Sequence, residues 1–310
     1  MGTVAVVFPG QGSQRTGMAQ DFCDRFRVSR DVFTEASDAL GLDVAALCFT
    51  EDPRLDLTEF TQPAILTAEI AMWRALRDEF GLSASLFGGH SLGEYTALCA
   101  AGAVPLRAAV QLVRKRGALM QAAVPAGEGA MVAITGAGVA AMNFGSALDS
   151  IEVDIANVNS PDQVVLSGPH AAMSRACACV QEVANGVTLD LVPLTVSAPF
   201  HSRRMAVIEP EFRAAMDDAV HEFTAERSSA VTSNLRGDFH SGDPRDLLDA
   251  LERQVSGRVN WMANMRALAP LAGRILEVGP ARPLRGFFKS MGIEVTSIVS
   301  CKTAEKAVAA

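Results

Sequence analysis

Short apolar runs that end at glycine or proline and lead into helical segments constrain the fold of this chain most. Residues 4–8 (VAVVF) form such a run and end in Pro-Gly-Gln-Gly, as expected of a buried parallel strand that enters a loop. Helical patterns follow at 16–39 and 58–80, then a short strand at 85–87 and a helix that begins at Ser91. This alternation predicts an α/β fold with a parallel sheet.

The middle of the chain has a different rhythm. We predict a strand, a helix, two strands, a helix and a strand, at 130–135, 137–148, 153–158, 163–167, 169–184 and 187–192. The order β-α-β-β-α-β is that of a ferredoxin-like unit. The α/β alternation then resumes, with helices at 203–222, 245–255 and 281–290 and strands at 230–234, 274–278 and 293–299.

The two rhythms predict two domains. Residues 1–127 and 194–310 would form a discontinuous large α/β domain, and residues 128–193 a ferredoxin-like subdomain inserted into it. We place the hinges at residues 125–127 (PAG) and at Pro193, because glycine and proline punctuate regular structure.

Charge and cysteine content exclude several classes of function. The formal charge is −8, which disfavours non-specific nucleic-acid binding because that binding requires neutralisation of phosphates. The chain has no apolar run of about 18 residues, so we expect no membrane span, and its start lacks the basic region of a signal peptide. Six scattered cysteines without a CxxC pair or a histidine at metal-ligand spacing indicate reduced thiols, no metal and a cytoplasmic location.

The most informative segment is GHSLGEY at residues 89–95. Gly89, Ser91 and Gly93 satisfy GxSxG between a predicted strand and a predicted helix, which is the context of a nucleophile elbow. The serine hydroxyl would lie at a helix amino terminus, where backbone N–H groups and the helix dipole favour a developing oxyanion. The alternative is a glycine-rich loop with an N-capping serine.

A serine nucleophile requires a base, and five histidines are available, at 90, 170, 201, 221 and 240. Position favours His201, which follows a turn-rich junction at 197–200 directly after the predicted insert. His90 is adjacent to Ser91 and could line the pocket, but neighbouring side chains diverge. The other three lie in polar helical patterns or, for His240, in a loop rich in glycine, aspartate and serine.

Several motifs in one order resemble the malonyl-CoA:acyl carrier protein transacylase family. They are PGQGSQ at 9–14, GHSLGEY at 89–95, Arg116-Gly117, NVNSPDQVV at 157–165, His201, Gln254, VNW at 259–261 and EVGP at 277–280. The resemblance covers essentially the whole chain. It implies an α/β-hydrolase-like large domain with a parallel sheet core and a ferredoxin-like insert, in agreement with the alternation described above.

The resemblance also implies roles for individual residues. Ser91 matches the serine that becomes acylated, and His201 matches its general base. Gln11 and Leu92 match the residues whose backbone N–H groups form the oxyanion hole. Gln254 matches the residue whose main-chain carbonyl orients the histidine. The expected site is therefore a Ser–His dyad with a backbone partner.

Four residues are expected to bind the acyl group. Arg116 matches the arginine that pairs with the free malonyl carboxylate, a task suited to a guanidinium; in isolation it would read as part of a solvated basic helix face. His90 and Asn159 would line the pocket. Phe200 is a departure, because many fatty-acid relatives have serine there. Pro-Phe-His resembles acyltransferases that serve polyketide synthases and select malonyl over methylmalonyl units; simple packing is the alternative.

The implied activity is transfer of malonyl from malonyl-CoA to an acyl carrier protein or a polyketide synthase carrier domain, by ping-pong kinetics and with no cofactor. A carrier protein is acidic, as this chain is, so docking would use a local basic patch: Arg203 and Arg204, or Arg282, Arg285 and Lys289. Two other functions stay open from the sequence. One is an acyl-thioester hydrolase that clears carrier proteins with the same dyad, and the other is a non-catalytic module that binds them.

Overall fold

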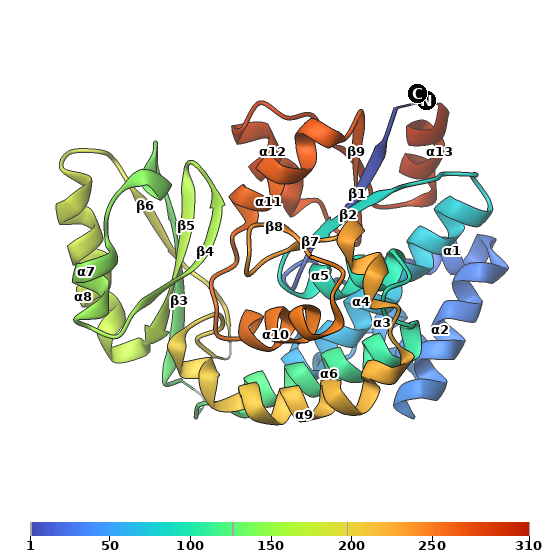
Figure 1. The fold of residues 1–310 in the computed structure, drawn as a ribbon, viewed down its shortest axis with the longest axis horizontal. Helices are drawn as coiled ribbons and strands as arrows, with labels where there is room; N and C mark the ends of the chain where they lie inside the picture. Colours follow the sequence, from blue (N-terminus) through green and yellow to red (C-terminus); the bar gives the residue numbers. More distant parts are fainter. Residues whose placement is uncertain (1, 126, 197, 310) are drawn as a thin grey trace.

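A computed structural model describes residues 2–125, 127–196 and 198–309 of the chain (Figure 1). Ala126, the centre of one predicted hinge, and Ser197, at the start of the junction before His201, lie outside the described residues. The ribbon shows a larger part built around β1, β2 and β9 and a smaller part that contains β3 to β6 (Figure 1).

The larger part is organised around a parallel sheet in the order β10-β9-β1-β2. Its strands are β1 (Val4–Phe8), β2 (Leu86–Gly89), β9 (Arg274–Val278) and β10 (Thr296–Ile298). Both faces are buried, as expected of strands that read as continuous apolar runs. Ala5 and Val7 face one apolar cluster, and Val6 and Phe8 face the other.

Helices cover both faces of this sheet. On the side of Val6 lie α1 (Gln20–Arg25), α2 (Arg27–Leu40), α3 (Val44–Phe49), α4 (Thr58–Asp78), α5 (Leu92–Ala100), α6 (Leu106–Ala122), α9 (Glu209–Ala219), α10 (Pro244–Gln254) and α13 (Cys301–Ala309). On the side of Val7 lie α11 (Trp261–Leu268) and α12 (Pro283–Ser290). The side chains of Trp261 and Phe288 fill that second layer and are fully buried.

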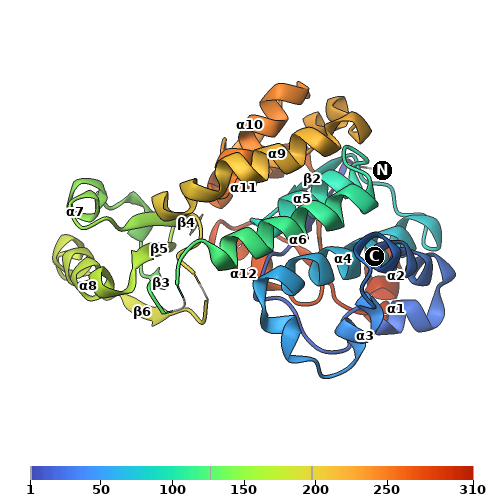
Figure 2. The same ribbon diagram turned by 90° about the horizontal axis from the view of Figure 1, so that it is seen from below.

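The smaller part is an antiparallel sheet in the order β4-β5-β3-β6 with two helices packed against it (Figure 2). The elements are β3 (Gly129–Thr135), α7 (Gly145–Asp149), β4 (Asp154–Ser160), β5 (Gln163–Pro169), α8 (His170–Ala184) and β6 (Asp190–Pro193). Alternate residues of β3 and β5 enter a separate apolar cluster with α8. The predicted α/β class, with a parallel sheet and a second antiparallel unit, is confirmed; the domain boundaries stay a prediction.

Several predicted elements differ in extent. The helix predicted at 16–39 is two helices, because Phe26 adopts an extended backbone between α1 and α2. The helix predicted at 137–148 is a 3-10 turn (Val139–Ala141) followed by the five-residue α7, since Gly138 adopts a left-handed conformation. The helix predicted at 203–222 has 3-10 segments at Arg203–Ile208 and Val220–Glu222 around α9.

The strand predicted at 230–234 is shorter in the structure. It is reduced to β7 (Thr232–Ser233), which pairs antiparallel with β8 (Asp238–Phe239), and an isolated parallel bridge joins the preceding Val231 to Phe87 of β2. The strands expected at 187–192 and 293–299 are shortened to β6 and β10. The short helices α3, α11 and α13 were not predicted.

Backbone hydrogen bonds between β4 and the segment before α11 join the two parts. Val158 N donates to Val259 O at 3.0 Å, and Val259 N donates to Ala156 O at 2.8 Å, so the segment before α11 extends the pairing of β4. Within the described ranges, no helix is both long and apolar enough to cross a membrane.

Candidate active site

Ser91 lies on a sharp turn between β2 and α5. Its backbone has φ 53° and ψ −104°, outside the regions that residues with a side chain prefer. The flanking glycines make this turn possible by close approach. A Cβ at Gly89 would lie 1.9 Å from the carbonyl carbon and oxygen of Gly93, and a Cβ at Gly93 would lie 2.2 Å from Phe8 O. The predicted nucleophile-elbow geometry is therefore present, and both glycines are sterically required.

His201 faces Ser91 directly. Its Nε2 is 2.7 Å from Ser91 Oγ, although the two residues are 110 positions apart. Its Nδ1 is 2.9 Å from Gln254 O and 3.2 Å from Gly257 O. A carbonyl oxygen only accepts, so Nδ1 carries the proton and the lone pair of Nε2 points at the serine hydroxyl.

The electrostatic surroundings keep His201 neutral. The side chain is buried, and burial, followed by the nearby charge of Arg116, lowers the pKa of His201 to about 3. Its backbone also adopts a positive φ of 55°. The imidazole is thus held in the proton-accepting form in a conformation that the unconstrained chain would avoid.

Arg116 reaches the same point from α6 and is 1% exposed. Its Nη2 donates to Ser91 Oγ at 3.2 Å and to Gln254 Oε1 at 2.8 Å, and its Nη1 donates to Gln62 Oε1 at 2.8 Å. The guanidinium also lies over the Tyr95 ring, 5.3 Å from its centroid. Within residues 2–125, 127–196 and 198–309 it forms no ion pair, and its Nε has no hydrogen-bond partner. Its charge is therefore buried without a carboxylate partner among these residues.

Of the two residues expected to form an oxyanion hole, Leu92 follows Ser91 directly. Leu92 is the first residue of α5, so its N–H is one of the helix's free amino-terminal donors. The amide of Ser91 itself is occupied by Asn234 Oδ1 at 2.6 Å. The loop that holds Gln11 packs on the elbow, since a Cβ at Gly10 would lie 2.5 Å from His90 O.

The smaller sheet contributes Asn159 to the rim of the site. Asn159 Oδ1 is 2.8 Å from His90 Nε2, and Asn159 Nδ2 donates to Gln163 Oε1 at 2.8 Å. Because the amide oxygen only accepts, His90 donates through Nε2. Burial lowers the pKa of His90, so its ring is neutral. Phe200 is buried in the large apolar cluster one residue before His201.

Four buried polar residues that sequence reasoning missed belong to the hydrogen-bond network of Ser91, Arg116 and Gln254. Glu94, Asn234 and Gln62 are each at most 1% exposed, and His240, which the sequence placed in a polar loop, is 4% exposed and 2.8 Å from Glu94 Oε1. One signal was available for Glu94, which is three positions after Ser91 and therefore on the same side of α5. The others have partners more than 50 positions away, which no local pattern encodes.

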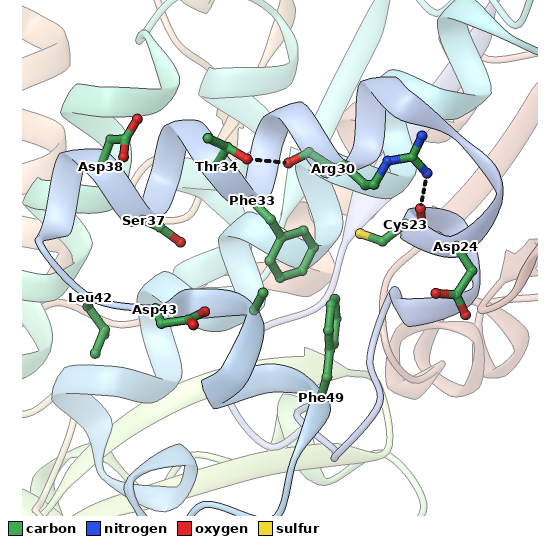
Figure 3. Close-up of a pocket in the computed structure, with 11 residues that line it drawn as sticks. Cys23, Asp24, Arg30, Phe33, Thr34, Ser37, Asp38, Leu42, Asp43 and Phe49 are labelled. Carbon is green, nitrogen blue, oxygen red and sulfur yellow. Dashed lines mark hydrogen bonds between the residues drawn. The ribbon is translucent and has the colours of Figure 1, made fainter.

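A cavity of about 600 Å³ lies elsewhere, between α2 and α3 (Figure 3). Its aromatic wall is formed by Phe33 and Phe49, and its polar groups are already used locally. Arg30 donates to Cys23 O, Thr34 Oγ1 donates to Arg30 O, and Ser37 Oγ accepts from Val44 N. The Arg30 contact is made at the end of α1, the Ser37 contact at the start of α3 and the Thr34 contact within α2, so these three groups are bonded locally. Among the described residues, no group of three or more His, Cys, Asp or Glu could hold a metal ion.

Comparison with known proteins defines the class first. The family model described as "Acyl transferase domain" matches residues 5–267. A malonyl CoA-acyl carrier protein transacylase of Salmonella typhimurium is 39% identical over 292 residues, which cover 92% of this chain and 91% of the relative. The chain belongs to the malonyl-CoA:acyl carrier protein transacylase family.

Solved structures agree in fold and in length. An acyl-carrier-protein S-malonyltransferase from Burkholderia pseudomallei superimposes with a TM-score of 0.91 at 37% identity, covering 99% of this chain and 100% of that one. A malonyl-transacylase in complex with a type II polyketide synthase acyl-carrier protein gives a TM-score of 0.88 at 33% identity, covering 99% of both chains. The likeness therefore extends over both sheets.

Proposed function

We propose that this chain transfers a malonyl group from malonyl-CoA to the phosphopantetheine thiol of an acyl carrier protein and carries the malonyl on Ser91 in between. The activity is that of a malonyl-CoA:acyl carrier protein S-malonyltransferase for fatty-acid or polyketide synthesis. The observation that carries the assignment of residues is the 2.7 Å distance from Ser91 Oγ to a neutral His201 Nε2. A hydroxyl becomes an effective nucleophile when such a base takes its proton.

In the first half-reaction, Ser91 Oγ attacks the thioester carbonyl carbon while its proton passes to His201 Nε2. The carbonyl oxygen becomes an oxyanion, which the backbone N–H groups of Gln11 and Leu92 stabilise. The C–S bond then breaks, and the sulfur of CoA takes the proton from His201. Malonyl remains on Ser91 as an ester.

The second half-reaction reverses these steps with a different thiol. The phosphopantetheine thiol gives its proton to His201 and attacks the ester carbonyl. The C–O bond to Ser91 breaks, and the serine oxygen recovers the proton from His201. Because CoA leaves before the carrier protein reacts, the kinetics are ping-pong.

Arg116 selects the acyl group. Its Nη2 is 3.2 Å from Ser91 Oγ, and in a malonyl ester one methylene separates the carbonyl from the free carboxylate. The guanidinium is thus within reach of that carboxylate. A hydrogen bond to a charged group contributes roughly 1.5–3 kcal/mol, which corresponds to about 10- to 100-fold preference over a neutral acyl group.

The carrier protein docks on α12 rather than on the segment after His201. Arg203 is paired with Asp149 and Asp154, and Arg204 with Glu152, so the charges of these two predicted docking residues are already balanced. The exposed side chains of Arg282, Arg285 and Lys289 make no ion pair within the described ranges. Phe287 of α12 also lies 6.3 Å from the His90 ring at the rim of the site.

The cytoplasm is the compartment that fits the thiols. All six cysteines are free, and burial raises the pKa of Cys23 and Cys99 to about 12. Thiols persist in reducing compartments such as the cytoplasm.

Intact-protein mass spectrometry tests the function. Malonyl-CoA should add one malonyl group to the wild type and none to Ser91→Ala, and an acyl carrier protein should then remove it and gain the same mass. Release of free malonate at the expense of carrier acylation would instead support the thioester hydrolase. Absence of any acyl-serine would overturn the proposal in favour of a binding module.

A further inference from the structure

Glu94 is a buried carboxylate that the transfer mechanism does not use. It has 0% exposure and lies on α5, three residues after Ser91. Its Oε2 accepts from Gln254 Nε2 at 2.7 Å and from Asn234 N at 3.0 Å, and its Oε1 is 2.8 Å from His240 Nε2. Carboxylates are almost never fully buried unless they have bonding partners. The three partners of Glu94 make its burial possible and tie it to Gln254, Asn234 and His240.

The contacts of Glu94 fix which way the Gln254 side-chain amide faces. The amide has two N–H donors and one acceptor oxygen. Its two neighbours on one side are Glu94 Oε2 and Ser91 O, at 2.7 and 3.0 Å from Gln254 Nε2. Both receive hydrogen bonds there, so the NH₂ group must face them. The amide oxygen is consequently turned toward Arg116 Nη2, 2.8 Å away.

This orientation decides what Arg116 can do. Hydrogen-bond acceptors fix the plane of the guanidinium. In the opposite orientation, the NH₂ group of the Gln254 amide would face the N–H groups of Arg116, and no hydrogen bond could form. The three acceptors it has, on Gln254, Gln62 and Ser91, are all neutral. The carboxylate of Glu94 is separated from it by the Gln254 amide. Arg116 is therefore held in place, and its charge is not consumed by a direct ion pair.

We propose that Glu94 is a positioning residue for acyl selection: it sets the Gln254 amide so that Arg116 is held in the plane that receives the substrate carboxylate. The main-chain carbonyl of Gln254, which holds His201, does not depend on this orientation. Loss of Glu94 thus lowers the preference for malonyl over acetyl more than it lowers the reactivity of Ser91. The inference rests on the proposed function of Ser91 and Arg116.

The experiment compares kcat/KM for acyl-serine formation from malonyl-CoA and from acetyl-CoA. Glu94→Met removes the acceptor and should lower the malonyl-to-acetyl ratio by about tenfold, the lower end for a charged hydrogen bond. Glu94→Gln keeps an oxygen that can accept a hydrogen bond from Gln254 and should therefore retain most of the wild-type malonyl-to-acetyl ratio. Glu69→Met is the matched control, because Glu69 is also 0% exposed but bonds to Thr96.

A second variant keeps the test decisive if Glu94→Met does not fold. Gln254→Met removes the side-chain amide, keeps the main-chain carbonyl and should lower the ratio to a similar extent. If Glu94 acts through this amide, the double variant loses no more selectivity than Gln254→Met alone. A wild-type ratio in Glu94→Met or in Gln254→Met, or additive losses in the double variant, would overturn the inference. Failure of the wild type to take up malonyl would instead refute the proposed function.

Discussion

The active site and the cavity between α2 and α3 are built from the same kinds of side chain and use them in opposite ways. Each contains a serine, an arginine and a phenylalanine, at 91, 116 and 200 in the site and at 37, 30 and 33 in the cavity. In the cavity the polar groups bond to backbone 4 to 7 positions away. In the site the side-chain hydrogen bonds of Ser91, Arg116 and Gln254 reach partners 25 to 163 positions away.

The difference shows that convergence, and not open volume, marks the functional region. A polar group that bonds within its own turn stabilises that turn and is saturated. A polar group that reaches across the fold is held by several elements at once and can be left with unused capacity, as Arg116 is at its Nε. Matched substitutions in the two regions test this distinction.

The largest contrast is expected between the two serines. Ser91→Ala should abolish acyl-enzyme formation, a loss of at least about 10³-fold, because loss of a nucleophile leaves only the binding groups. Ser37→Ala should leave malonyl transfer unchanged and lower the free energy of unfolding by about 1 kcal/mol, since it removes one hydrogen bond to Val44 N. Transfer rates and urea unfolding of both variants check this. Acylation of Ser91→Ala at the wild-type rate would show that Ser91 is not the nucleophile.

The two arginines should differ in acyl selection. Arg116→Ala is expected to lower malonyl loading by about 10- to 100-fold relative to acetyl loading, because only the malonyl group carries a free carboxylate. Arg30→Ala should leave both loadings unchanged, since Arg30 is exposed and donates to Cys23 O. Radiolabelled malonyl-CoA and acetyl-CoA give the two rates. Equal loss of both acyl groups in Arg116→Ala would show that the arginine supports the fold of the site and not its selectivity.

The two phenylalanines separate pocket shape from packing. Phe200→Ser should increase methylmalonyl loading relative to malonyl by about tenfold, because one methyl group accounts for roughly 1–3 kcal/mol of discrimination. Phe49→Ser removes a ring that packs 5.0 Å from Phe33 and should change stability without changing that ratio. Competition between malonyl-CoA and methylmalonyl-CoA measures the ratio of methylmalonyl to malonyl loading. No gain of methylmalonyl in Phe200→Ser would identify Phe200 as a packing residue only.

The features that could be predicted from the sequence are those that short segments determine. GxSxG fixes the elbow because its two glycines and its serine lie within five residues, and the strand alternation of β3 and β5 predicts the smaller sheet. The pairing of Ser91 with His201 came from position and from the family resemblance. The elbow motif and the fold class could be predicted without knowing which distant residues pack against them.

The buried polar residues behind these positions could not be predicted, because their roles depend on tertiary contacts. Glu94 is one residue of a recognised motif, but its partners Asn234, His240 and Gln254 are 140 to 160 positions away. His240 stands among glycine, aspartate and serine, a composition typical of an exposed loop, but it is buried with its Nε2 2.8 Å from Glu94 Oε1. Arg203 and Arg204 looked available for docking because their acidic partners come from the insert, about 50 positions earlier.

The smallest expected effect is a shift in the pH dependence of acylation. In the proposed mechanism His201 acts as a base only when neutral, so kcat/KM is expected to fall as the pH drops through its pKa of about 3. Burial is the first cause of that low pKa and remains in Arg116→Gln, while the second cause, the arginine charge, is removed. The pKa of His201 therefore rises in this variant, and the acid limb for acetyl loading moves to higher pH. Arg30→Ala should leave the limb where it is. Histidine NMR titration of the folded proteins gives an independent reading, and an unshifted limb in Arg116→Gln would mean that the guanidinium does not act on the base.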